Sequence, residues 1–298
     1  MIDDAFASLA PLEGGRSGET FVAQAGGERQ VVRIHARDPG RAEVDAALLR
    51  LVRGLVPVAD VLEVRPPRGD MPALLVTSFL PGERGDLHLA SRDDDRVAGL
   101  AWDMGELAAT LAGMPMLTGG ALVGADLRIE PFDGAADGLP AHVDAHRPAL
   151  AHWSPEELTG LAEVAEVAQA LLDTVDRTCL VHGDLNPTNV LVEPGTGWIT
   201  GLVDWERAHA GHPFTDLGSV LRHDRGPVYV EVVLSAFEDR HGVAPDDALA
   251  LARAADLRAL IDLAGRRGQD PVGDRAHDLL RGIATSRDLG WTLPEAPA

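Results

Sequence analysis

The chain has 298 residues and a formal net charge of −21, and its 26 basic residues are all arginine. A chain of this length can bury the core of one large domain or of two modest ones. Its 45% hydrophobic and 24% charged residues exclude a wholly disordered protein. So acidic a chain disfavours nucleic acid and anionic membranes as partners and attracts cationic small molecules. The alternative is that the charge serves only to keep the protein soluble.

Cysteine usage and the N-terminal residues bear on the cellular compartment. Cys179 is the only cysteine, so no intramolecular disulfide can form. The first ten residues lack the basic and apolar regions of a signal peptide, and no apolar run is long enough to span a bilayer. We therefore expect a cytoplasmic protein without membrane contact, acting as a monomer or homodimer.

Residues 1–80 are expected to form a small β-rich domain. The predicted elements in chain order are a glycine-rich turn (14–18), a strand (20–23), a two-glycine turn (26–27), a strand (30–34), a helix (41–53) and strands over 57–64 and 74–80. Two short strands on either side of a two-glycine turn are typical of a β-hairpin. Pro81-Gly82 ends the last strand.

Residues 81–298 are expected to form a larger, mainly helical domain. An amphipathic helix is predicted from Ser91 towards Leu111, whereas residues 113–150 have weak periodicity and are predicted to be loops, with short helices as the alternative. The sequence Ser154-Pro155-Glu156-Glu157 predicts a helix start that continues to about Val175. From Thr215 onward we predict further helices, separated by breaks at 226–227, 242–245 and 268–271.

The segment 180–217 carries the residues best suited to chemistry. A polar loop is followed by two predicted strands, 190–192 and 198–203, and by Asp204. Because a hairpin brings its two open ends together, we expect Asn189 and Asp204 to lie close. An amide and a carboxylate oxygen suit Mg²⁺. Asp184 stands outside this pair, where it can accept a proton from an attacking hydroxyl in phosphoryl transfer.

The order His182-Gly183-Asp184, Asn189 and Asp204 resembles the catalytic and metal motifs of the aminoglycoside phosphotransferase family, and residues 201–222 resemble its second signature. The resemblance implies an α+β, two-lobed protein-kinase-like fold with a β-rich N-terminal lobe and a larger, mainly helical C-terminal lobe. It also implies Asp184 as catalytic base, Asn189 and Asp204 as Mg²⁺ ligands, and ATP or GTP as the phosphate donor.

The same resemblance implies a nucleotide site within the first 80 residues. Arg33 takes the strand position where kinases usually place a phosphate-contacting lysine, and its guanidinium can clamp phosphate oxygens. Glu43 is the first candidate for the helix acid that orients Arg33, and Asp45 is the alternative. The remaining expected contacts are backbone groups of the glycine-rich turn (Gly15, Ser17, Gly18) on the phosphates and of the hinge (Ser78, Leu80) on the nucleobase.

Several functions remain open. The acceptor is expected to be a hydroxyl of an aminoglycoside-like or other cationic antibiotic, and the alternative is a metabolic kinase for choline, homoserine or a sugar. Intact Asp184, Asn189 and Asp204 argue against a regulatory pseudokinase. A metal hydrolase using His182, Asp184, Asp204 and His209 is disfavoured because we find no tight paired-histidine motif. His182 is expected to be structural, and Asp216 is expected to cap the next helix and to steady the catalytic loop.

Overall fold

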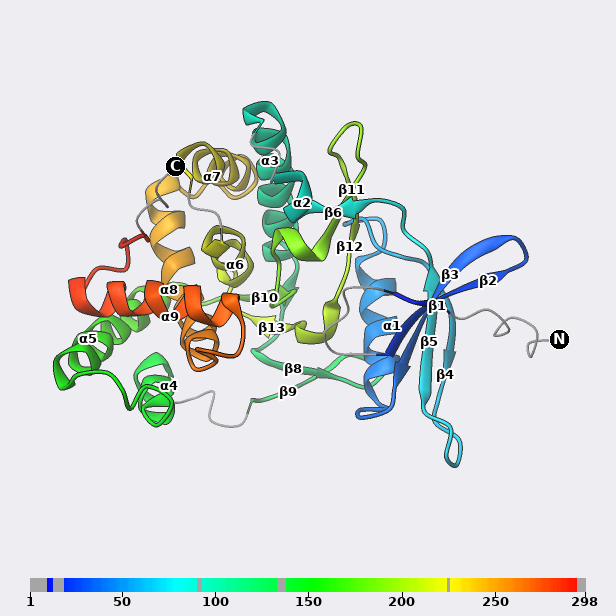
Figure 1. Ribbon diagram of the computed structural model, residues 1–298, viewed down its shortest axis with the longest axis horizontal. Helices are drawn as coiled ribbons and strands as arrows, with labels where there is room; N and C mark the ends of the chain where they lie inside the picture. Colours follow the sequence, from blue (N-terminus) through cyan, green and yellow to red (C-terminus); the bar gives the residue numbers. More distant parts are fainter. Residues whose placement is uncertain (1–9, 13–18, 90–92, 133–137, 224–225, 294–298) are drawn as a thin grey trace. The chain divides into compact units, whose positions relative to one another are not determined.

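The computed structural model describes residues 10–12, 19–89, 93–132, 138–223 and 226–293 (Figure 1). The chain divides into two compact units. Unit 1 comprises Met1–Leu100, Gly120–Glu130 and Asn186–His209; unit 2 comprises Ala101–Gly119, Pro131–Leu185 and Ala210–Ala298. Each unit combines separate stretches of chain, so the expected lobe boundary at residues 80 and 81 stays a prediction.

The main sheet of unit 1 is antiparallel, with the strand order β1-β2-β3-β5-β4. Its strands are β1 (Ala10–Pro11), β2 (Glu19–Ala25), β3 (Glu28–His35), β4 (Val61–Arg65) and β5 (Ala73–Ser78). The predicted β2–β3 hairpin is confirmed. Gly26 and Gly27 both have positive φ, 62° and 86°, which glycine adopts without a Cβ penalty and a two-residue hairpin turn requires.

Helix α1 (Arg41–Val52) confirms the predicted helix and packs against β4 and β5. Its buried face is apolar apart from one carboxylate: the buried residues are Ala42, Val44, Asp45, Ala46, Leu48, Leu49 and Val52. A buried carboxylate on an apolar face needs a specific partner. Asp45 is therefore expected to pair with a cationic side chain on this side of α1.

Unit 1 also contains a three-stranded sheet, β12-β11-β6, built from β6 (Glu83–Arg84), β11 (Val190–Val192) and β12 (Ile199–Leu202). The predicted β11–β12 hairpin is confirmed, with Val190 opposite Leu202. The 3-10 helices η2 (Pro187–Asn189) and η3 (Trp205–Arg207) lie at its open end, and α2 (Gly85–Leu89) follows β6. A second hairpin of this unit joins β8 (Gly120–Val123) to β9 (Arg128–Glu130).

Unit 2 is mainly helical. Helix α3 (Asp94–Ala112) enters it at Ala101. Then follow α4 (Gly138–His146), α5 (Pro155–Leu172), α6 (Thr215–His223), α7 (Pro227–His241), α8 (Pro245–Ala264) and α9 (Pro271–Ser286). The short strands β7 (Pro115–Met116), β10 (Thr178–Val181) and β13 (His209–Gly211) complete the described elements. The three predicted breaks between the last helices are confirmed.

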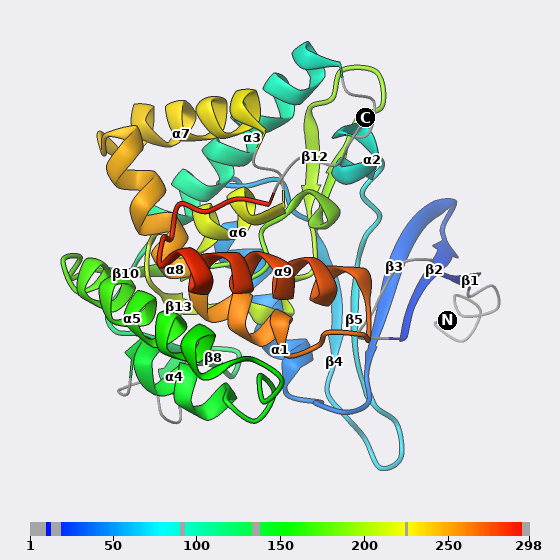
Figure 2. The same cartoon turned by 60° about the vertical axis from the view of Figure 1, so that its left-hand side comes forward.

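A single apolar cluster joins α4, α5, α8 and α9, centred on side chains such as Trp153, Leu161 and Leu280. Figure 2 shows α9 and α5 side by side. Gly160 permits this close approach, because a Cβ at that position would collide with the backbone oxygen of Ala284. Among the described residues, none of the helices combines the length and the apolar character needed to cross a membrane.

The expectation of loops over 113–150 missed three short strands, whereas the alternative of short helices is confirmed by α4. That stretch contains β7, β8, β9 and the nine-residue helix α4. Strands of two to four residues are too short to show a period of two, and β7 gains its pairing from β10, more than 60 residues later. Such elements depend on tertiary pairing, which local sequence does not reveal.

The start of α5 is the predicted capping box. Ser154 Oγ accepts the Glu157 N–H at 3.2 Å, and Glu157 Oε2 accepts the Ser154 N–H at 2.7 Å. Replacing Ser154 with alanine removes one of these acceptors and is expected to lower the free energy of unfolding by about 1 kcal/mol in urea denaturation.

Ser235→Ala is the matched control, because Ser235 is exposed within α7 and caps nothing. Its effect is expected to stay within about 0.5 kcal/mol. Equal losses in the two variants would contradict the capping role of Ser154.

Candidate active site

The open end of the β11–β12 hairpin brings Asn189 and Asp204 together. Val203 N–H donates to the carbonyl oxygen of Asn189 at 2.9 Å, and Asp204 is the next residue. On the other side, Asn186 Oδ1 accepts the Thr188 N–H at 2.9 Å and caps the 3-10 turn that carries Asn189. Asn189 and Asp204, fifteen positions apart in the sequence, therefore lie at two neighbouring strand ends.

The backbone of Asp204 is left-handed, with φ 65° and ψ 60°. This region is uncommon for residues other than glycine, although aspartate and asparagine tolerate it best. Trp205 fixes the turn that follows, because its ring is buried and its Nε1–H donates to Leu202 O at 3.2 Å. The turn keeps the Asp204 side chain one-third exposed (33%), so its carboxylate stays accessible.

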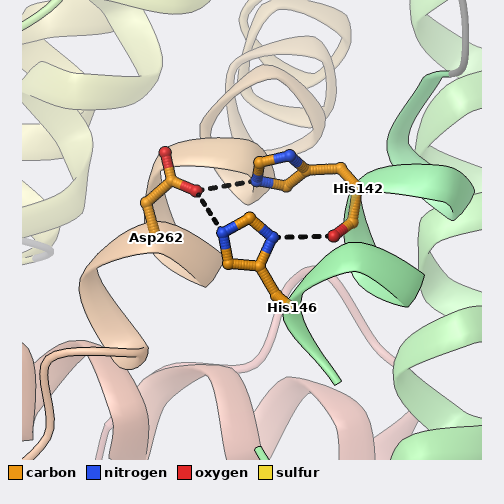
Figure 3. A group of neighbouring side chains, drawn as sticks. All are labelled: His142, His146 and Asp262. Carbon is orange, nitrogen blue, oxygen red and sulfur yellow. Dashed lines mark hydrogen bonds and ion pairs between the residues drawn. The ribbon is translucent and has the colours of Figure 1, made fainter. Parts of the chain in front are cut away.

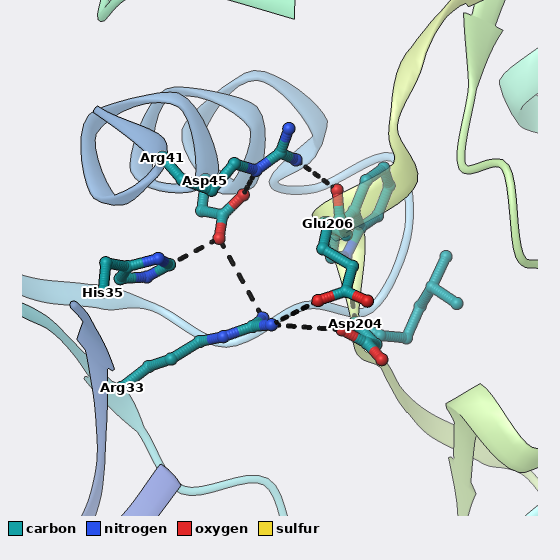
Figure 4. Close-up of polar contacts among 8 residues, drawn as sticks. Arg33, His35, Arg41, Asp45, Asp204 and Glu206 are labelled. Atoms are coloured by element: carbon teal, nitrogen blue, oxygen red, sulfur yellow. Dashed lines mark hydrogen bonds and ion pairs between the residues drawn. The ribbon is translucent and has the colours of Figure 1, made fainter. Parts of the chain in front are cut away.

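Arg33 connects this hairpin end to the main sheet (Figure 4). Its Nη2 lies 3.4 Å from Asp204 Oδ1 and 2.9 Å from Glu206 Oε2. Its Nη1 lies 3.9 Å from Asp45 Oδ2. The guanidinium of β3 thus faces one carboxylate of α1 and two carboxylates from the segment after β12.

The helix acid beside Arg33 is Asp45, which corrects the predicted pairing with Glu43. Asp45 is 3% exposed, while Glu43 is exposed to solvent on another side of α1. The two are two residues apart on a helix, so they cannot share a face. Asp45 Oδ1 also accepts Arg41 Nε–H at 2.6 Å, which supplies the partner that a buried carboxylate needs.

His35 completes the surroundings of Asp45, with Nε2 at 3.8 Å from Asp45 Oδ2. Burial lowers the pKa of His35, which outweighs the opposing pull of Asp45. The imidazole is therefore neutral at pH 7, and the positive charge beside Asp45 comes from Arg41 and Arg33. Arg41 also donates to the carbonyl oxygen of Trp205, the residue directly after Asp204.

Asp184 belongs to unit 2, on the loop that follows β10. Two backbone N–H groups of this loop, from His182 and Gly183, donate to Asp216 at 2.8 and 3.0 Å. Asp184 N–H lies 3.3 Å from the fully buried His182 Nδ1. His182 thus holds the turn from inside, and the Asp184 side chain is half-buried.

Asp216 was expected as the N-cap of the next helix, and that expectation was wrong. Helix α6 begins at Thr215, so Asp216 lies inside the first turn and points its carboxylate back at the Asp184 loop. Burial raises the pKa of Asp216 to about 6, against the two N–H donors that lower it, with nearby Asp184 raising it further.

The remaining predicted nucleotide contacts fall in two places. Gly15, Ser17 and Gly18 lie outside the described residues. At the hinge, the N–H groups of Ser78 and Phe79 already donate to Asp60 O at 2.9 Å and Arg29 O at 3.3 Å. Within the described part of the chain, the Leu80 N–H has no such backbone acceptor, which is compatible with the predicted contact.

Two residues of this site were not assigned a role from sequence. Glu206 follows Asp204 by two positions, and only the left-handed turn and η3 show that it folds back onto Arg33. Arg41 reads as an ordinary helix-start arginine until its contacts with Asp45 and Trp205 are seen. The signal available in sequence was the i, i+4 spacing of Arg41 and Asp45.

A model of the phosphotransferase enzyme family matches residues 8–261. The chain belongs to this family. The resemblance inferred from the motifs is therefore confirmed.

Sequence relatives of the chain differ in how much of each sequence they match. The aminoglycoside 3'-phosphotransferase of Streptomyces fradiae is 28% identical over 243 residues, 76% of this chain and 85% of that enzyme. Acyl-CoA dehydrogenase family member 11 of Mus musculus is 29% identical over 94 residues. That match covers 26% of this chain and only 12% of the length of the mouse protein.

Solved structures show the fold. A ternary complex of aminoglycoside phosphotransferase APH(4)-Ia with ADP and hygromycin B has a TM-score of 0.66 at 18% identity, covering 96% of this chain and 95% of that one. A GDP complex of aminoglycoside 2'-phosphotransferase-IIIa also reaches 0.66, at 19% identity and 97% coverage of both chains. The predicted α+β class, with a β-rich part and a mainly helical part, is confirmed.

The buried Asp216 predicts an unusual pH dependence of the free energy of unfolding. Its pKa is raised to about 6 from an ordinary 3.8, so the folded state holds the proton more tightly than the unfolded state. Its stabilising contribution is complete below the unfolded pKa and is lost as pH rises through about 6, by about 3 kcal/mol in total.

Asp216→Asn removes this titration. The free energy of unfolding of the wild type minus that of Asp216→Asn is therefore expected to fall as pH rises from about 4 to about 7. Urea denaturation of both proteins across this range measures the difference. A difference that rises with pH would contradict the raised pKa.

Proposed function

We propose that this chain transfers the γ-phosphate of ATP or GTP to a hydroxyl of a small molecule, with an aminoglycoside-like or other cationic antibiotic as the first candidate acceptor. The observation that carries the proposal is the position of Arg33 between Asp45 and the Asp204–Glu206 turn, in a member of the phosphotransferase family. The ADP–hygromycin B and GDP complexes of the structural neighbours support a nucleotide donor and this class of acceptor.

Asn189 and Asp204 fit a magnesium site by their chemistry. One offers an amide oxygen and the other a carboxylate, from two adjacent strand ends, and Mg²⁺ prefers a few such hard oxygen donors alongside phosphate oxygens and water. When bound, the ion would neutralise charge on the transferred phosphate. Glu206 is a third carboxylate within reach of Arg33, and it adds to the negative charge that attracts a divalent cation.

Arg33 is suited to the phosphates of the donor. Because the chain has no lysine, a permanent cation at this strand position must be arginine, which binds phosphate oxygens through two N–H groups. Its contact with Asp204 puts the phosphate-binding cation beside the proposed metal ligand. A polyphosphate that binds the metal would therefore also meet the guanidinium.

Asp184 is the proposed catalytic base. It is an acceptor whose loop is fixed by Asp216 and His182, so its carboxylate can orient a hydroxyl without reorganising. In phosphoryl transfer the protein mainly positions the nucleophile and balances charge. At the hinge, Leu80 N–H is the proposed donor to the nucleobase, because the neighbouring N–H groups are engaged.

The net charge of −21 favours a cationic acceptor. A metabolic kinase for choline, homoserine or a sugar is the second candidate, since choline is also cationic. A cytoplasmic location and a monomeric or homodimeric state are part of the proposal.

The function is tested by measuring nucleotide consumption, with Mg²⁺ and either ATP or GTP, against aminoglycosides, macrolides, peptide antibiotics, choline and homoserine. We expect consumption that depends on one acceptor class, with phosphate on an acceptor hydroxyl by ³¹P NMR. Nucleotide binding without turnover on any acceptor would favour the pseudokinase, and no nucleotide binding at all would overturn the proposal.

Asp184→Asn is expected to leave Mg²⁺-nucleotide binding nearly intact and to lower kcat by about 10²–10⁴, because it removes the base. Lost positioning of the hydroxyl would add to that loss. Asp204→Asn is the matched comparison, since it should weaken the binding of the magnesium nucleotide as well. Wild-type turnover in Asp184→Asn would rule out Asp184 as the base.

Asp45→Asn and Glu43→Gln separate the two candidate helix acids. Asp45→Asn weakens a charge-assisted contact that orients Arg33 and is expected to raise the KM for nucleotide by about tenfold. Glu43→Gln changes an exposed side chain of the same helix, and its KM should match the wild type. A larger effect of Glu43→Gln would restore Glu43 as the partner of Arg33.

A further inference from the structure

Two histidines and a carboxylate converge in unit 2, in a part of the chain that the phosphotransferase proposal does not use (Figure 3). His142 and His146 lie one turn apart on α4, and Asp262 lies on α8. His142 Nε2 is 2.8 Å and His146 Nε2 is 3.2 Å from the same oxygen, Asp262 Oδ1. One donor atom from each residue lies within 4.8 Å of the others.

This arrangement has the spacing of a transition-metal site. Residues four apart on a helix share a face, so both imidazoles project towards α8. In a tetrahedral zinc site with bonds of about 2.0–2.2 Å, neighbouring donor atoms lie roughly 3.3–3.6 Å apart. The distances of 2.8 and 3.2 Å reach that range after side-chain movements well under about 1 Å.

The two ring nitrogens of His146 have different partners, the carbonyl oxygen of His142 and the carboxylate of Asp262. Its Nδ1 lies 2.8 Å from the carbonyl oxygen of His142, which can only accept, so Nδ1 carries a proton. In the neutral ring the lone pair of Nε2 then faces the Asp262 oxygen, so two electron-rich atoms point at each other. A positive charge between them resolves the contact, either a proton on Nε2, which makes an imidazolium–carboxylate ion pair, or a metal ion in its place. The Nδ1–carbonyl bond is the outer contact that metal-binding histidines usually make.

Arg258 is the group that opposes a metal here. Its Nη1 lies 3.0 Å from His142 Nδ1, and because a guanidinium can only donate, it favours the His142 tautomer with a proton on Nε2. Metal binding through Nε2 therefore requires Arg258 to release His142. Arg258 can do so because this contact is exposed to solvent.

We propose that His142, His146 and Asp262 bind a divalent transition metal, Zn²⁺ first, and that the ion crosslinks α4 to α8. Two imidazoles and one carboxylate favour zinc over magnesium, so this site is distinct from the proposed magnesium site. The side chains are 13%, 30% and 41% exposed, which lets an ion enter from solvent and leaves a coordination position for water.

The sequence contains the signal for this site, which corrects the expectation that the chain has no tight paired-histidine motif. The spacing His142-Val143-Asp144-Ala145-His146 is such a pair on a helix. The third ligand lies 120 positions after the first, and only the fold brings it into place.

The test titrates metal-free full-length protein with Zn²⁺ by calorimetry and measures bound metal after dialysis, with Co²⁺ as a visible probe of the coordination geometry. We expect one Zn²⁺ per chain, a rise in Tm with zinc in the wild type, and visible Co²⁺ bands of a low-coordinate site. His146→Ala and Asp262→Asn should each lower the affinity at least about tenfold and abolish the zinc-dependent rise in Tm.

His152→Ala is the matched control. His152 Nε2 also faces another histidine, His277, at 2.8 Å, but no carboxylate oxygen completes that pair into a three-ligand group among the described residues. His152→Ala should bind zinc like the wild type. Absence of stoichiometric zinc, or equal affinity in His146→Ala and the wild type, would overturn the proposal.

Arg258→Gln is expected to raise the affinity for zinc, whereas a misfolded variant would lose affinity. Removing the competing donor and its charge should raise zinc affinity by about tenfold. Unchanged or weaker binding in Arg258→Gln would contradict the coordination through His142 Nε2. None of these measurements uses phosphotransferase activity, so their failure leaves the proposed function untouched.

Discussion

The site in unit 1 depends on one chain of charge-assisted contacts. Arg33 of β3 faces Asp45 of α1 and the carboxylates of Asp204 and Glu206. Arg41 binds Asp45 from the other side and donates to the carbonyl oxygen of Trp205. The left-handed turn at Asp204 is thereby attached to the helix as well as to its own strand. A buried carboxylate held in this way is costly to unpair, so the network fixes Arg33 and the proposed metal ligand Asp204 together.

The charge balance of this network has a functional consequence. Three carboxylates face two guanidinium groups, and His35 is neutral because burial lowers its pKa. The cluster therefore carries excess negative charge at a partly exposed position. In the proposed function, a divalent cation held by Asp204 and a polyphosphate held by Arg33 would offset charge on both sides of the cluster. If the proposed function holds, we therefore expect the site to prefer the metal complex of a nucleotide over the free nucleotide.

Local sequence was sufficient where a turn or a cap determines the element. The two-glycine turn predicted the β2–β3 hairpin, and Ser154 with Glu157 predicted the start of α5. It was insufficient where a choice depends on the face that a helix buries. Glu43 and Asp45 both fit the sequence pattern, and only the packing of α1 on β4 and β5 decides between them. The inward turn of Asp216 likewise depends on where α6 begins.

The composition of this chain determines which residue types are informative about functional sites. With 47 acidic residues, an aspartate near any motif is weak evidence, and Glu206 and Asp262 could not be distinguished from surface acids. Histidine is scarcer, with 11 in the chain, so a pair at helical spacing such as His142 and His146 is the more informative signal. A carboxylate indicates a functional site only where it contacts a side chain of a different type. Asp45 and Asp204 contact a guanidinium, and Asp262 contacts two imidazoles. In a protein this acidic, the scarcer partner residues locate the sites, and the acids then follow from the geometry.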